Sequence, residues 1–177
     1  MTPPLPSVTT HVGVGYDSHR FAPDGAATGA AVGKPLVIAG VVMPGDTRVI
    51  AHSDGDVAAH AVTDAVLGAA ALGDIGELFP NSDAANAGRD SMEMLRLAVQ
   101  RVRAAGWNVV NVDVAVVAER HRVGPHRAAM RQRLAAALQV PADAVFVKGK
   151  TNEGLGWIGQ GEGLAAHAVA SLVRAGG

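Results

Sequence analysis

The sequence predicts a single α/β (or α+β) domain, with one mixed sheet of about four main strands, helices packed on one face and a small hairpin. Valine-rich stretches alternate with Ala- and Leu-rich stretches of helical periodicity, which is the first ground for this prediction. The second is length, because 177 residues suffice for one core and fall short of two comfortable domains. No internal repeat or linker divides residues 11–177, whereas the proline-rich residues 1–10 are expected to form a disordered tail.

The first half of the chain places a long buried helix after short strands. In order we expect a strand over 12–16, a Gly-, Ala- and Pro-rich loop over 20–34, a hairpin over 35–44, and a helix over 54–72. Serine and aspartate before the helix are typical N-cap residues. Residues 73–80 allow one helical turn at most, and the polar residues 81–90 are expected to be mobile.

The second half alternates helices and strands. An amphipathic helix over 91–105 ends at Gly106, and the valines of 107–118 indicate a strand that is buried on both faces. A polar turn, a second amphipathic helix over 126–138 and a strand over 145–148 follow. Residues 151–163 hold five glycines and predict a loop that faces a ligand, while 164–173 fits a strand or a helix equally well by pattern.

Composition excludes several classes of protein and of site. The net charge of −1 gives no general attraction to nucleic acid or to a membrane surface. No apolar run reaches the length of about 18 residues that a membrane span requires. The first ten residues lack the features of a secretory signal, so the cytoplasm is the expected location. Without cysteine, a closed thiolate zinc site is excluded.

One histidine of the long helix is flanked by carboxylates. Asp56, His60 and Asp64 recur at a spacing of four and therefore lie on one helix face. These polar groups are costly in an apolar helix unless something compensates them. Either His60 is an ordinary core histidine beside capping or paired aspartates, or it is a metal ligand that Asp64 orients.

A second pair of polar residues favours the metal ligand. Asp17 and His19 alternate along a short strand, so they point to the same side of it. With His60 they make an Asp-His-His set, and three protein ligands with an open fourth position suit a catalytic Zn²⁺. An Asp-x-His pair is common, so spacing alone gives only moderate support.

Three blocks resemble the 2-C-methyl-D-erythritol 2,4-cyclodiphosphate synthase family. They read GYDSHRF from Gly15, AHSDGDVAAHAVTDAVLGAAALGDIGELFP from Ala51 and KTNEGLGWIGQGEG from Lys150, in the family's order and spacing. The resemblance runs from about Val12 to the C-terminus and favours a strand over 164–173. It implies conversion of 4-diphosphocytidyl-2-C-methyl-D-erythritol 2-phosphate to the cyclic diphosphate with release of CMP, a lyase reaction of the non-mevalonate isoprenoid pathway.

The resemblance also implies metals and residue roles. Asp17, His19 and His60 would hold Zn²⁺, and Glu153 would be the protein ligand of a Mg²⁺ or Mn²⁺ ion that bridges the substrate phosphates. His52 and Thr151 are the implied catalytic residues. The implied substrate-binding positions are Asp17, His19, His52, Ser53, Asp74, Ile75, Gly76, Phe79, Asp83, Ala118, Arg122, Gly124, Lys150, Thr151, Asn152, Glu153, Trp157 and Gln160.

Several of these residues have simpler explanations by sequence alone. Without the resemblance, Glu153 is more readily explained as an exposed loop carboxylate. Lys150 is equally a surface lysine, and His52 with Ser53 could simply cap a helix. The chain departs from the family pattern at Gln160, where arginine is usual, and at Trp157, where phenylalanine is common. Since glutamine lacks the charge and the forked donor of arginine, we expect weak binding of phosphate-bearing isoprenoids at the axis of the assembly.

The family forms homotrimers with active sites between subunits, so a homotrimer is the implied assembly. In that arrangement, residues 118–124 and 150–153 would face Asp17, His19, His52 and His60 of a neighbour.

The competing functions are a non-catalytic zinc-dependent nucleotide-binding module and a metal-dependent phosphohydrolase, which needs a positioned water and usually more carboxylates.

Overall fold

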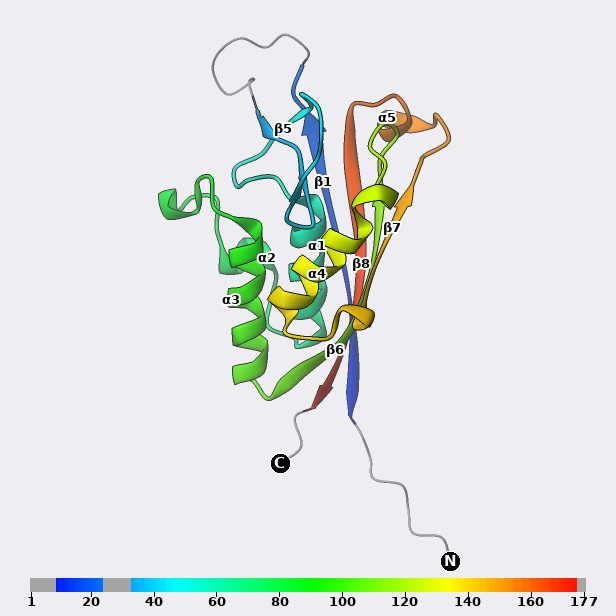
Figure 1. The fold of residues 1–177 in the computed structure, drawn as a ribbon. Helices are drawn as coiled ribbons and strands as arrows, with labels where there is room; N and C mark the ends of the chain where they lie inside the picture. Colours follow the sequence, from blue (N-terminus) through cyan, green and yellow to red (C-terminus); the bar gives the residue numbers. More distant parts are fainter. Residues whose placement is uncertain (1–8, 24–32, 175–177) are drawn as a thin grey trace, which may run out of the picture.

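The computed structural model describes residues 9–23 and 33–174 and shows one sheet with helices on one face (Figure 1). The predicted tail over 1–10 lies mostly outside the described residues, but Thr10 already belongs to the first strand. Most of the 20–34 loop also lies outside them.

The six-stranded sheet has the order β2-β5-β1-β8-β6-β7. All neighbouring pairs are antiparallel except β6 and β7, so the predicted mixed sheet is confirmed. Its long strands are β1 (Thr10–Phe21), β6 (Trp107–Val117), β7 (Val145–Lys150) and β8 (Gly163–Arg174). The short strands are β2 (Lys34–Pro35) and β5 (Arg48–Ile50), the latter of which we did not predict.

The hairpin predicted over 35–44 is present as β3 (Val37–Ile38) and β4 (Val41–Val42). Its turn residues, Ala39 and Gly40, both have positive φ angles, as two-residue hairpin turns require.

Three helices lie on one face of the sheet (Figure 1), namely α1 (Val57–Ala69), α3 (Ser91–Ala104) and α4 (Arg127–Leu138). Helix α1 lies against β1 and β8, α4 against β7, and α3 against α1. The shorter turns are α2 (Ile75–Leu78), η2 (Ala84–Asn86), η3 (Gly124–His126), η4 (Ala142–Ala144) and α5 (Gly156–Gly159).

Three predictions about these elements need correction. Strand β1 extends past Tyr16 to Phe21, so Asp17 and His19 lie within a strand and not at its end. Helix α1 begins at Val57 and ends at Ala69, inside the predicted 54–72. Strand β6 is buried on its helix-facing side only, because no described element covers its other face.

Two glycines bring α1 unusually close to β1. A Cβ atom on Gly13 would lie 2.1 Å from the Ala65 carbonyl oxygen, and one on Gly15 would lie 1.9 Å from that of Ala61. Any side chain at these positions would therefore push the helix away. Because side chains alternate along a strand, Asp17 and His19 continue the same helix-facing row. The glycines thus place both residues under α1.

Candidate active site

Asp17, His19 and His60 form a cluster with metal-ligand geometry between β1 and α1. Their candidate ligand atoms all lie within 4.8 Å of one another. The Asp17 Oδ2 atom is 3.1 Å from His19 Nδ1 and 2.9 Å from His60 Nδ1. The predicted Asp-His-His set is therefore assembled by the fold.

The contacts between Asp17 and the histidines of this cluster change the pKa values of Asp17 and His60. Burial alone would raise the pKa of Asp17, but the contacts with His19 and His60 outweigh burial and lower that pKa to about 2. Burial likewise opposes the charged form of His60, yet the contact with Asp17 raises its pKa above the usual value. The cluster therefore holds an ionised Asp17 carboxylate beside the His60 imidazole, and each favours the charged form of the other.

The donor set fits a divalent metal ion. His19 Nδ1 is buried and lacks a hydrogen-bond partner of good geometry, although it lies 3.1 Å from Asp17 Oδ2. An unpartnered buried nitrogen is costly unless a ligand occupies its lone pair. Two imidazole nitrogens and one carboxylate oxygen are borderline ligands that suit Zn²⁺ and leave a coordination position open.

The proposed role of Asp64 is wrong. Its Oδ1 atom accepts a hydrogen bond from the Ile75 amide at 2.8 Å and so fixes the start of α2. The His60 Nε2 atom instead lies 3.0 Å from Ser53 Oγ and 2.8 Å from Ser91 Oγ. Asp56 also serves another partner, because it caps α1 and binds the hairpin turn. Asp56, His60 and Asp64 therefore share a spacing of four but have separate partners.

A pocket opens above the cluster. Its lining includes eight residues of the predicted metal and substrate sites, namely Asp17, His19, His52, Ser53, His60, Ile75, Gly76 and Phe79. Sequence reasoning missed three further lining residues, Asn81, Asn86 and Met94. No spacing signal in the sequence distinguishes these three residues. Asn86 is buried, and its side-chain amide is satisfied there because its NH₂ donates to the Pro80 carbonyl and its oxygen accepts from Arg89.

Two predicted ribose- and substrate-binding carboxylates lie beside this pocket without being part of its lining. Asp74 caps α2 by accepting from the Glu77 amide at 2.8 Å, and Asp83 caps η2 by accepting from Ala85 at 2.9 Å. The Asp74 cap fixes the turn that carries Ile75 and Gly76, and the Asp83 cap fixes the turn that follows Phe79 and Asn81 in the chain.

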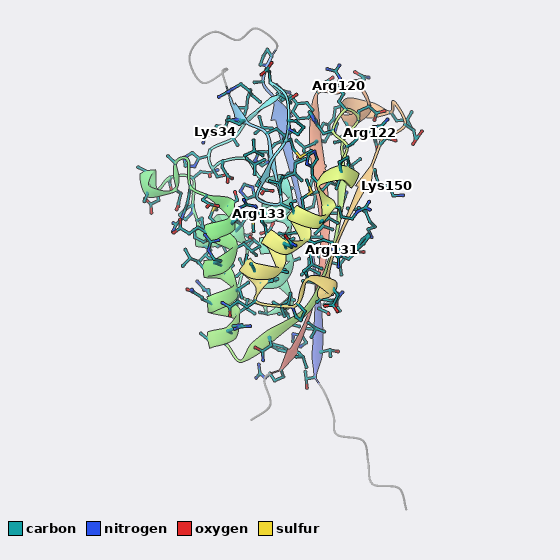
Figure 2. All side chains as sticks on the ribbon, in the orientation of Figure 1. Lys34, Arg120, Arg122, Arg131, Arg133 and Lys150 are labelled. Atoms are coloured by element: carbon teal, nitrogen blue, oxygen red, sulfur yellow. The ribbon has the colours of Figure 1, made fainter. Side chains whose placement is uncertain are left out.

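The remaining predicted residues form a second unit at the end of β6 and β7. Glu119 accepts hydrogen bonds from the Asn152 and Gly154 amides at 3.1 and 3.3 Å, which joins the 118–124 segment to the 150–154 segment. Thr151 Oγ1 donates to Glu153 Oε1 at 2.6 Å, and both side chains are exposed. Figure 2 shows Arg122 and Lys150 at this same end of the molecule.

This second unit does not line the pocket above the metal cluster within one chain. Its predicted members are Ala118, Arg122, Gly124, Lys150, Thr151, Asn152, Glu153, Trp157 and Gln160, and none of them is among the pocket's lining residues. The short helix α5 carries Trp157 and ends at Gly159, directly before the exposed Gln160. Sequence reasoning expected a glycine-rich loop here and missed this helical turn.

The acid stability of the metal-free protein should depend on Asp17. Because the folded-state pKa of about 2 lies below the ordinary value of 3.8, ionised Asp17 stabilises the fold above about pH 4. This contribution, about 2 kcal/mol at most, should disappear as the pH falls through 2. Urea unfolding across this range should therefore show the wild type and Asp17→Asn converging in stability at low pH. A difference that stays constant with pH would contradict the assignment.

No helix in the described parts of the chain is both long and apolar enough to cross a membrane.

Known proteins match this chain along nearly its whole length. The model of the YgbB family matches residues 10–173. The 2-C-methyl-D-erythritol 2,4-cyclodiphosphate synthase of Gemmatimonas aurantiaca is 55% identical over 170 residues, which cover 96% of this chain and 97% of the relative.

Solved structures agree with this match. The bifunctional IspDF from Campylobacter jejuni superposes with a TM-score of 0.86 at 38% identity, covering 96% of this chain and 43% of that longer one. A CDP-bound 2C-methyl-D-erythritol-2,4-cyclodiphosphate synthase gives a TM-score of 0.78 at 37% identity over 91% of this chain and 99% of that chain. The chain therefore belongs to the YgbB family, the family of the 2-C-methyl-D-erythritol 2,4-cyclodiphosphate synthases.

Proposed function

We propose that this protein is a metal-dependent 2-C-methyl-D-erythritol 2,4-cyclodiphosphate synthase. The observation that carries the proposal is the Asp17, His19 and His60 cluster at the base of a pocket, in a chain that belongs to this family. The substrate's 2-phosphate oxygen forms a bond to the β-phosphorus, and the bond from that phosphorus to the CMP phosphate breaks. CMP leaves with the bonding electron pair, so the reaction consumes no water.

Catalysis of such a transfer needs positioning and neutralisation of charge, and it needs no protein nucleophile. Asp17, His19 and His60 would hold Zn²⁺, which polarises a phosphate oxygen when bound. Glu153 would hold a second ion, Mg²⁺ or Mn²⁺, together with substrate and water oxygens.

The chain's own polar groups orient the substrate. His52 and Ser53 receive the 2-phosphate near the start of α1, where the helix dipole favours an anion. Asp74, Ile75 and Gly76 receive the ribose hydroxyls. The loop over 118–124, with Ala118, Arg122 and Gly124, reads cytosine largely through backbone groups, while Lys150, Thr151 and Asn152 donate to the diphosphate.

A homotrimer would bring the two units of the site together. The helix-free face of the sheet exposes Val12, Val14 and Val169, at 70%, 72% and 45%. Val14 and Val169 are direct cross-strand neighbours, so these side chains form one apolar surface. Burying it against other subunits gives a driving force for assembly. The 118–124 and 150–154 segments of one subunit could then face the metal cluster of the next.

The decisive test is incubation of the purified protein with the cytidyl substrate and Mg²⁺, followed by phosphorus NMR. Equimolar CMP and cyclic diphosphate are the expected products. Linear phosphate products would identify a phosphohydrolase, and nucleotide binding without turnover would identify a non-catalytic module.

Glu153→Gln should leave zinc bound and strongly raise the Mg²⁺ concentration needed for activity. A hard cation prefers a carboxylate charge, and the amide keeps the shape without that charge. The rate is measured against Mg²⁺ concentration, with Glu162→Gln as a control carboxylate of the same glycine-rich segment. An unchanged Mg²⁺ dependence in Glu153→Gln would show that Glu153 is not the ligand.

A further inference from the structure

Two serine hydroxyls contact the His60 ring on the side that faces away from Asp17. His60 Nδ1 faces Asp17, and His60 Nε2 lies 2.8 Å from Ser91 Oγ and 3.0 Å from Ser53 Oγ. All three residues are buried, and Ser91 is only 1% exposed. Water therefore has little access to this nitrogen, and its partner must be one of the two hydroxyls.

Ser91 is in turn bound to a carboxylate. The Ser91 hydroxyl donates to Asp54 Oδ1, and the Ser91 amide donates to Asp54 Oδ2 at 3.0 Å. An ionised carboxylate can only accept, so the serine proton is committed to Asp54. The Ser91 oxygen then offers a lone pair to His60, which must donate from Nε2.

Ser53 makes a different kind of contact. Its hydroxyl oxygen accepts from the Gly55 amide at 3.2 Å, and no described contact connects it to a carboxylate. Ser53 can therefore hold the ring in place, but it does not link the ring to a negative charge. Only Ser91 provides that link among the described residues.

The segments that carry Asp54 and Ser91 are fastened to each other. The Asp54 amide donates to the Arg89 carbonyl at 3.1 Å, and the Gly88 amide donates to the His52 carbonyl at 2.8 Å. Lys34 Nζ adds a bond to the His52 carbonyl at 2.8 Å. These contacts between protein groups fix the positions of Asp54 and Ser91 relative to each other.

We infer that Ser91 and Asp54 are positioning residues for the metal site, forming a carboxylate–hydroxyl–imidazole relay that keeps the proton on His60 Nε2 and presents Nδ1 to the ion. This inference rests on the proposed role of His60 as a zinc ligand. Ligating histidines commonly donate their second N–H to an acceptor, which fixes the ring and makes it a stronger ligand. Here the acceptor is a serine, and a carboxylate behind it polarises the hydroxyl.

Ser91→Ala tests the relay with little damage to the fold. The substitution removes the hydroxyl and keeps the backbone amide that binds Asp54 Oδ2. The zinc dissociation constant, measured by competition with a chromophoric chelator, should rise about 10- to 100-fold.

Thr63→Ala is the matched control. It removes a buried hydroxyl of α1 that donates to the Ala59 carbonyl and not to His60. Zinc affinity should stay unchanged in this variant. Equal zinc affinity in wild type and Ser91→Ala would overturn the relay, whereas a wild type that binds no zinc would overturn the metal site itself.

A double-mutant cycle separates a relay from two independent effects. In a relay, Asp54→Asn weakens zinc binding in the wild-type background and has no further effect once Ser91 is alanine. Additive losses of affinity would show that Asp54 does not act through the serine.

NMR of the zinc-loaded protein gives a readout that needs no activity. The His60 Nε2–H proton should give a downfield signal that exchanges slowly with solvent, because Ser91 accepts it. In Ser91→Ala that signal should move and exchange faster, and in Thr63→Ala it should not change. An unchanged signal in Ser91→Ala would identify Ser53 as the acceptor and refute the proposal.

Discussion

Replacing His60 with alanine should abolish tight zinc binding and lower kcat/KM by about three orders of magnitude. His60 supplies one of three protein ligands, and its loss leaves Asp17 and His19 as an incomplete site. The His60 residue is 9% exposed, and among the described residues only Asp17 and His19 belong with it to the candidate metal site. Metal analysis of the purified variant and steady-state kinetics measure the two effects.

The control for this experiment is His11→Ala, which removes a histidine of β1 that is not part of the metal cluster. His11 binds the Ala69 carbonyl at the far end of the same strand and helix. Its loss should leave zinc content unchanged. Full zinc occupancy in purified His60→Ala would refute the ligand assignment.

Replacing Asp56 with alanine should destabilise the protein by about 4 kcal/mol. The Asp56 side chain is 0% exposed and accepts hydrogen bonds from four backbone amides. Two of these belong to the first turn of α1, and the other two belong to Ala39 and Gly40 in the hairpin turn. Alanine would leave all four donors without this acceptor, and three of these bonds are buried, so the loss is far costlier than that of an exposed cap.

Asp56→Asn should have an intermediate effect. The amide oxygen can keep the three bonds made by Oδ1, but its NH₂ group would face the Gly40 amide, where two donors repel. Asp90→Ala is the matched control, since Asp90 is an exposed N-cap of α3 and its loss should cost about 1 kcal/mol.

Urea unfolding at fixed protein and zinc concentrations compares these variants. Equal losses of stability in Asp56→Ala and Asp90→Ala would show that the hairpin contacts of Asp56 contribute nothing. The pKa of Asp56 is raised by burial, and its backbone donors oppose that rise. Since the protonation state of Asp56 affects its hydrogen bonds, all variants are compared at one fixed pH.

The sequence predicted the core elements because their signals are local. The valine run of β6 and the amphipathic pattern of α3 each follow from periodicity within one segment. Strand β5 escaped prediction because it has only three residues and owes its conformation to pairing with β1 and β2. The extension of β1 to Phe21 likewise depends on its partner β8 and not on its own propensity.

The metal cluster was predictable in part from local signals and depended in part on tertiary contacts. Alternation placed Asp17 and His19 on one side of a strand, and both gained a partner only because Gly13 and Gly15 admit α1 so closely. The same helical spacing that selected His60 also selected Asp64, which turned out to bind Ile75. Spacing identifies a shared face, whereas hydrogen-bond partners depend on which loop packs against that face.

By itself the sequence determined the order of the main elements, the three residues of the candidate metal site, and the residue types that could carry the chemistry. Only the tertiary structure decided that Ser91 and Asp54 stand behind His60, that Asp56 joins a hairpin to a helix, and that Asn81, Asn86 and Met94 line the pocket. The physical reason is the distance along the sequence over which each kind of interaction acts. Backbone preference and periodicity act over a few residues, but the Ser91–His60 and Asp54–Ser91 contacts join residues 31 and 37 positions apart, and only packing of the whole chain brings such residues within hydrogen-bonding distance.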